Sequence, residues 1–226
     1  MPTSFEETPE RWLPELPIWS FCENASRSQG IEDFGLRVGL GTDVAEIGAF
    51  GRALRAATTL RDALETFLRD LNTHSSCGRY GLKRDCEWVW FWRTGVAGLR
   101  CDPVEQYVVG LMVQIVRLAA GPHWAADHVA LQASGLPGGL AAETFAGARI
   151  QLRAPLSAVR FPSVLLATPL RSPGRDEESA LAGLQFEQPP ENLVDSLKLG
   201  LESALPHGSP GLRWAAHAAN MSPRTL

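Results

Sequence analysis

Apolar residues recur every three or four positions in several segments of the chain, as they do on one face of a helix. This spacing predicts three helices before position 121, over about 43–57, 60–72 and 102–120. Thr59 and Asp62 have the spacing of a capping box at the start of the second helix. Asp102 and Pro103 predict the start of the third, with an N-cap carboxylate followed by proline. Because prolines interrupt the apolar residues before position 33, we expect an arm or short helices there.

Residues 78–94 have the alternation of a β-hairpin, with Arg84-Asp85 as the predicted turn. Successive side chains of a strand point to opposite faces, so Trp88, Trp90 and Trp92 share one face of the second strand. Val89 and Phe91 occupy the other face, and apolar residues on both faces predict a central strand that is covered on both sides. Further strands are predicted over 128–132 and 149–153, with a short helix over 140–146 between them. This order predicts an α+β fold, with a mixed or antiparallel sheet packed with helices.

The last third of the chain changes character. Over residues 171–190, Pro, Gly and charged residues replace periodic apolar residues, which predicts a linker. Leucines four residues apart then predict an amphipathic helix over 193–205. Ser209-Pro210 and Ser222-Pro223 are two helix-start patterns separated by a short alanine-rich segment, as in a helix-turn-helix. The start of the second helix of such a motif contacts DNA, which makes Ser222, Arg224 and Thr225 the candidate DNA-binding residues.

Residues 209–226 resemble the first helix-turn-helix of AraC-type transcription regulators, above all at Ala215-Ala216 and over 221–226. In that helix-turn-helix the family usually has glycine where this chain has Asn220. The segments 34–39, 59–64 and 159–170 resemble the arabinose-binding-like N-terminal sensor of the same family. The resemblance implies an effector-sensing and dimerisation domain over 1–170, the linker, and a truncated start of a helix-turn-helix DNA-binding domain over 191–226. The implied partners are a small-molecule effector, DNA through the full-length C-terminal domain, and a second copy of the chain. The family name does not identify arabinose as the effector.

The candidate ligand-binding residues are aromatic or cationic side chains, namely Trp88, Trp90, Trp92, Arg93 and Trp124. Aromatic rings offer a large contact area with few rotatable bonds, and an arginine can hold an anionic group. The alternative interpretation is that the tryptophans pack in the core and the arginine forms a salt bridge. The sensor itself also has an alternative, a ligand-free module that serves only for dimerisation.

Composition and motifs exclude several other functions. The four cysteines form no C-x-x-C pair and have no histidine cluster beside them, so we expect no metal. Neither a nucleophile elbow nor a complete dinucleotide loop occurs, so we expect no cofactor and no enzyme, and a small-molecule enzyme is the weakest alternative. The acidic start and the lack of a long apolar run predict a soluble, cytoplasmic protein without a membrane partner. The net charge is −4, which does not favour non-specific DNA binding.

Overall fold

A five-stranded sheet lies at the centre of the described residues, which are 15–71, 75, 78–95, 99–136, 138–170, 192–205, 210–219 and 221–225 of this computed structural model. The strands are β1 (Arg79–Asp85), β2 (Trp88–Thr94), β3 (His128–Ala130), β4 (Arg149–Gln151) and β5 (Ser157–Pro162). Their spatial order is β1-β2-β5-β3-β4, in which β3 and β4 are parallel and the other neighbours antiparallel. The sheet is therefore mixed, and the predicted α+β class is confirmed.

The hairpin between β1 and β2 turns two residues later than the sequence predicted. Asp85 is paired with Trp88, so the turn consists of Cys86 and Glu87 and not of Arg84-Asp85. Cys86 has a φ of 52°, in the left-handed region that tight hairpin turns require. The turn was misplaced because cysteine is not one of the residues that usually adopt this conformation.

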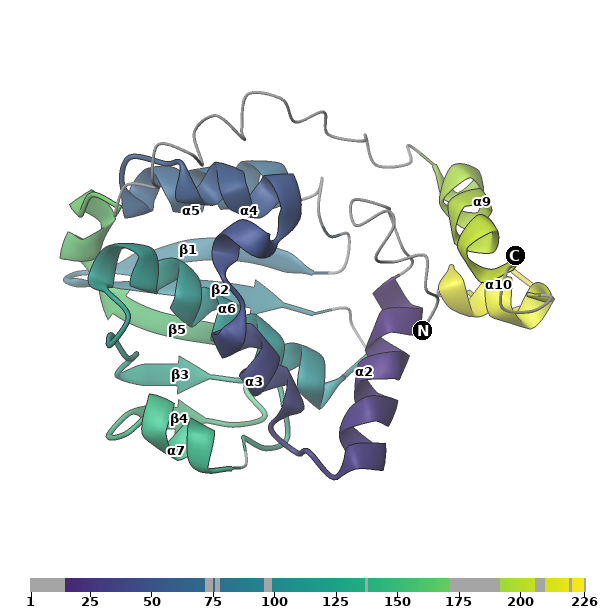
Figure 1. Cartoon of the computed structure of the whole chain (residues 1–226), viewed down its shortest axis with the longest axis horizontal. Coiled ribbons are helices and arrows are strands. Elements are labelled where there is room, and N and C mark those ends of the chain that lie inside the picture. The colour runs from purple at the N-terminus through teal and green to yellow at the C-terminus, as the bar shows by residue number, and fades with distance from the viewer. Residues whose placement is uncertain are drawn as a thin grey trace.

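Helices pack on one face of the sheet, as Figure 1 shows for α3, α4, α5 and α6. The helical segments of this region are α2 (Glu15–Gln29), α3 (Phe34–Gly41), η1 (Val44–Glu46), α4 (Gly48–Arg55), α5 (Leu60–Asp70), α6 (Asp102–Ala120), α7 (Gly139–Thr144) and η3 (Ser163–Ala167). The capping box of α5 is present: the Asp62 carboxylate accepts from the Thr59 N–H, and the Thr59 hydroxyl accepts from the Asp62 N–H. The start of α5 is thus fixed by its own sequence.

Three sequence predictions about helices are corrected. The single helix expected over 43–57 is two pieces, η1 and α4, because Gly48 at the start of α4 adopts a φ of 60°. The N-cap of α6 is Cys101 and not Asp102, whose carboxylate accepts instead from the backbone N–H of Ser134. The segment before residue 33 forms α2, a helix of 15 residues. Pro17 lies in its first turn, where backbone N–H groups have no partner within the helix, so the proline does not break it.

Helices α3 and α6 approach each other backbone to backbone. A methyl group added at Gly39 would lie 2.4 Å from the backbone oxygen of Tyr107, and one added at Gly35 would lie 1.7 Å from that of Pro103. Gly110 of α6 has the same relation to the backbone of α3. No side chain fits between the two helices at these three positions, which we call the glycine seam.

The C-terminal part contains α9 (Leu193–Ala204) and α10 (Leu212–Ala218). Helix α10 packs against α9 and against α2, and its Ala216 is buried. Figure 1 shows α2 between α10 and the helices that cover the sheet. After α10, residues 223–225 form a turn in which the Thr225 N–H donates to the Ser222 carbonyl. The helix-turn-helix stays a prediction, and the expected linker over 171–190 lies outside the described residues.

Among the described helices, none combines the length and the apolar character that a membrane crossing requires.

Candidate functional site

The three tryptophans of β2 lie together on the sheet face that the helices leave uncovered. Val89 and Phe91 on the opposite face are fully buried, whereas the tryptophans are only half-buried. The predicted alternation is confirmed, but the expectation that both faces of this strand are covered was wrong. Large aromatic side chains are compatible with either a buried or a half-exposed face, so the pattern alone did not distinguish the two.

The tryptophan rings are already in contact with other parts of the same chain. The Arg160 guanidinium lies 4.2 Å from the centre of the Trp88 ring, and its Nε donates to Asp127 at 3.1 Å. The ring of His128 meets Trp90 edge-on at 4.8 Å. Burial, followed by the positive charges of Arg160 and Arg149, lowers the pKa of His128. This face is thus a network of cation–π and ring contacts.

Arg93 is not part of the tryptophan face. It follows Trp92 in β2, so it points to the helix side, where its side chain is 2% exposed and pairs with Glu105 of α6 at 2.5 Å. The second carboxylate oxygen of Glu105 accepts from the Ser157 hydroxyl at 2.6 Å. Burial by itself would lower the pKa of Arg93, but Tyr80 and Glu105 outweigh that effect and the pKa is raised. The arginine is therefore part of a buried ion pair.

Trp124 lies in a third place, after the end of α6. It is partly buried against the main core, and its backbone oxygen accepts from Arg117 at 2.9 Å. The structure thus brings together three of the five predicted ligand-binding residues and separates the other two. Strand alternation already placed Arg93 opposite the tryptophans, so this error could have been avoided from the sequence.

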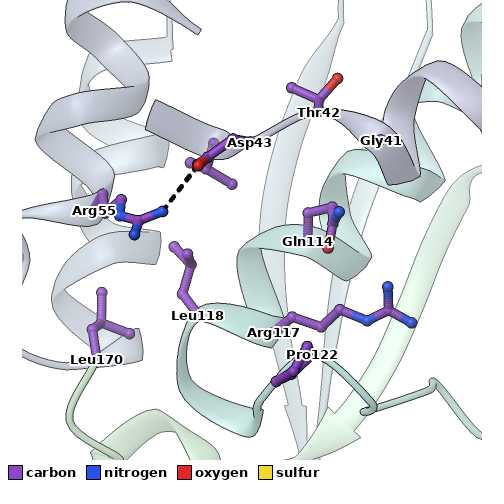
Figure 2. A pocket seen from close by; sticks show the side chains of 10 residues that line it. Gly41, Thr42, Asp43, Arg55, Gln114, Arg117, Leu118, Pro122 and Leu170 are labelled. Atoms are coloured by element: carbon purple, nitrogen blue, oxygen red, sulfur yellow. Dashed lines mark hydrogen bonds and ion pairs between the residues drawn. The ribbon is translucent and has the colours of Figure 1, made fainter. Parts of the chain in front are cut away.

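A cavity of about 430 Å³ lies on the helix side of the molecule, at the C-terminal end of α6. Its walls come from the turn after α3, from the last turns of α4 and α6, and from Leu170 after η3 (Figure 2). The lining residues are Gly41, Thr42, Asp43, Val44, Arg55, Gln114, Arg117, Leu118, Pro122 and Leu170. The volume is in the range of pockets that hold small molecules.

Arg55, Arg117 and Asp43 are the charged residues among the described lining of this cavity. Arg55 donates to both carboxylate oxygens of Asp43, at 3.0 and 3.3 Å, and Asp43 in turn accepts from the Ala45 N–H at the start of η1. Arg117 donates through Nε to the backbone oxygen of Trp124, and burial lowers its pKa. No carboxylate among the described residues pairs with Arg117. Among the described lining residues, the cationic side chains therefore exceed the carboxylates by one.

The sequence did contain a signal for this cavity. Gln114 and Arg117 are polar interruptions of the apolar surface of α6, and their spacing of three residues places them on one face of the helix. Polar residues on an otherwise buried helix indicate either a hydrogen-bonding role or a site. Arg55 carried no comparable signal, because it lies on another helix, far away in the sequence.

The candidate DNA-binding residues lie in the turn after α10. Ser222, Arg224 and Thr225 are exposed, and the hydroxyls of the serine and the threonine lie 2.7 Å apart. Their role in DNA binding stays a prediction. Within the described part of the chain, no group of three or more His, Cys, Asp or Glu side chains is arranged to hold a metal ion.

Comparison with known proteins identifies a family and also finds similar solved structures. Residues 5–170 match the family model described as the arabinose-binding domain of AraC transcription regulators, N-terminal part. No curated protein matches the chain. The crystal structure of the transcriptional regulator CdpR from Pseudomonas aeruginosa is similar, with 16% sequence identity and a TM-score of 0.46. That match covers 84% of this chain and 64% of the CdpR chain, so this chain spans less than two thirds of that regulator.

Proposed function

The chain belongs to the family of N-terminal arabinose-binding domains of AraC transcription regulators, and on this basis we propose that it is the effector-sensing part of a DNA-binding regulator. The observation that carries the proposal is the extent of the family match, which includes all five strands of the sheet and the helices that cover them. In this proposal residues 1–170 are the sensor, 171–190 the linker and 191–226 the start of the DNA-binding domain.

The effector-binding site of this proposal is the cavity at the end of α6. The tryptophan face is the less favourable position, because Arg160 already covers the Trp88 ring and His128 already contacts the Trp90 ring. The cavity, by contrast, is empty space bordered by polar groups and by apolar side chains such as Leu118 and Leu170. A few convergent polar groups in a partly apolar pocket are typical of small-molecule sites.

The proposed response to the effector is a population shift. An effector in the cavity touches the ends of both α3 and α6, and the glycine seam joins these two helices along their length. Helix α2 packs on α3 and α6, and α10 packs on α2. Binding thus biases the position of α10 and the segment after it, which in the full-length regulator places Ser222, Arg224 and Thr225 against DNA.

A screen of small metabolites by thermal shift tests the proposal with residues 1–226. A true effector raises the melting temperature in proportion to the logarithm of its concentration once it exceeds its Kd. The matched control is Leu118→Trp, which fills the cavity and should abolish the shift. A mobility-shift assay on the full-length regulator, with and without the hit, then tests the regulatory step. A hit that binds Leu118→Trp as well as the parent chain contradicts the assignment of the cavity.

The second candidate function is a ligand-free dimerisation module. The half-exposed tryptophans of β2 favour it, since a large aromatic surface is typical of protein contacts. Sedimentation equilibrium separates the two functions. A dimer that dissociates on Trp88→Ala, together with no thermal response to any metabolite, supports the module and contradicts the sensor.

A further inference from the structure

The charge balance of the cavity described above identifies the class of molecule that fits it. The charged residues among the described lining are Arg55, Arg117 and Asp43, and the carboxylate of Asp43 is already bound to Arg55. The charge of Arg117 has no such partner among the described side chains. A neutral ligand would leave this charge partly desolvated without compensation, whereas an anionic group would neutralise it.

The geometry of Arg117 leaves part of its hydrogen-bonding capacity available. A guanidinium carries five N–H donors, and the Nε–H of Arg117 is held by the backbone oxygen of Trp124 at 2.9 Å. This bond fixes the plane of the group, while its two terminal nitrogens make no hydrogen bond within the described part of the chain. In Figure 2 the Arg117 side chain extends away from Leu118 and Arg55, so its guanidinium lies at the edge of the cavity, beyond Gln114 and Pro122. A planar, oriented pair of N–H groups matches the two oxygens of a carboxylate.

The remaining walls describe the body of the ligand. Val44, Leu118, Pro122 and Leu170 provide apolar surface, and the described lining contains no aromatic ring. The side-chain amide of Gln114 lies near Arg117, and its N–H donates to the backbone oxygen of Leu40. A short carbon chain fits the apolar walls, with one charged end at the arginine.

We propose that the ligand of this cavity is a small organic monocarboxylate whose carboxylate is bound by the terminal nitrogens of Arg117. The inference rests on the proposed sensing function and specifies the effector's chemistry. Among the described lining residues, the Asp43–Arg55 pair leaves no second cation without a partner, so we expect one anionic group per ligand.

Matched pairs of acids and amides test this class on residues 1–226. The probes are C4 to C8 aliphatic carboxylates and the corresponding primary amides, with inorganic phosphate as a separate arm. We expect at least one carboxylate to raise the melting temperature with concentration, and its amide to do so only at far higher concentration. Arg117→Gln should weaken carboxylate binding by roughly 10- to 100-fold, the usual effect of losing a charge-assisted hydrogen bond. Arg69→Gln, at an exposed arginine of α5, should leave it unchanged.

A second measurement does not depend on the folding of a variant. The side-chain Nε–H resonance of Arg117 in the unmodified protein should shift on addition of the carboxylate and not on addition of the amide. The inference is overturned if amides bind as tightly as acids, if Arg117→Gln binds the acid unchanged, if phosphate binds and no carboxylate does, or if no carboxylate binds at all. A neutral metabolite that binds the parent chain but does not bind Leu118→Trp would overturn the inference that the ligand is a carboxylate. The same result would support the sensing function. Absence of every ligand in the broader screen would contradict both.

Discussion

The buried ion pair between Arg93 and Glu105 should be the most sensitive electrostatic contact of the sheet. Their side chains are 2% and 4% exposed, and one carboxylate oxygen lies 2.5 Å from the guanidinium. The other oxygen accepts from the Ser157 hydroxyl, which itself accepts from the Gln132 N–H at 3.0 Å. Glu105→Gln keeps the shape of the side chain, but leaves the arginine without its carboxylate and brings an N–H donor into a position built for acceptors.

The size of the effect follows from this burial. Breaking a buried pair by removal of one partner costs about 3–5 kcal/mol, because the buried charge loses its nearest counter-charge. For a chain of this size, each kcal/mol lowers the melting temperature by about 2–4 °C, so Glu105→Gln should lower it by about 6–20 °C. The exposed pair of Arg160 and Asp127 is the matched comparison, since its side chains are 26% and 44% exposed. Asp127→Asn should cost less than about 1 kcal/mol.

Urea denaturation followed by tryptophan fluorescence measures both variants, with circular dichroism as a check that unfolding is two-state. The double variant Arg93→Met with Glu105→Leu should recover much of the lost stability, because a well-packed apolar pair can replace a buried ion pair. If Glu105→Gln loses no more stability than Asp127→Asn, the pair is either hydrated or unformed, and the reasoning fails.

Three further predictions concern the seam, the thiols and the histidine. Gly39→Ala should lower the free energy of unfolding by about 1–3 kcal/mol or more. Gly139→Ala, whose new methyl meets nothing within 4 Å, should change it by less than about 1 kcal/mol. Equal effects of the two variants in urea denaturation would refute the close approach of α3 and α6. Iodoacetamide at pH 8 should label exposed Cys86 at least about tenfold faster than Cys101, whose pKa burial raises to about 11, and peptide mass mapping that finds equal rates would contradict that burial. Because the pKa of His128 is lowered below its ordinary 6.5, the unfolded chain binds the proton more readily and stability should fall as the pH drops below that value. His128→Gln should reduce this loss between pH 7.5 and 5.5 in the same denaturation assay, and an unchanged loss would show that other groups cause it.

Local features of this fold were accessible from the sequence. The capping box of Thr59 and Asp62 involves residues three positions apart, so its hydrogen bonds do not depend on the rest of the chain. The alternation of β2 likewise follows from strand geometry, and it placed the tryptophans on one face correctly. The α+β class followed from the order of such elements. These predictions succeeded because each depends on neighbours along the chain.

The candidate site could not be predicted from the sequence in the same way. Its walls come from Asp43, Arg55, Arg117 and Leu170, which only the tertiary fold brings together. The spacing of Gln114 and Arg117 indicated a polar face on α6, but could not show what that face borders. Similarly, the sequence showed that β2 has two apolar faces, but which face the helices cover depends on the hand and length of the connections between elements.

Under the proposed sensing function, the glycine seam limits how the effector specificity of this domain can change. At Gly35, Gly39 and Gly110 there is no side-chain volume to exchange, so repacking at these three contacts cannot accommodate a different ligand. New specificity has to arise around this rigid frame, from Thr42 in the turn after α3 or from Leu118 on the surface of α6. Libraries for biosensor engineering should therefore randomise the rim of the cavity and leave the three glycines untouched.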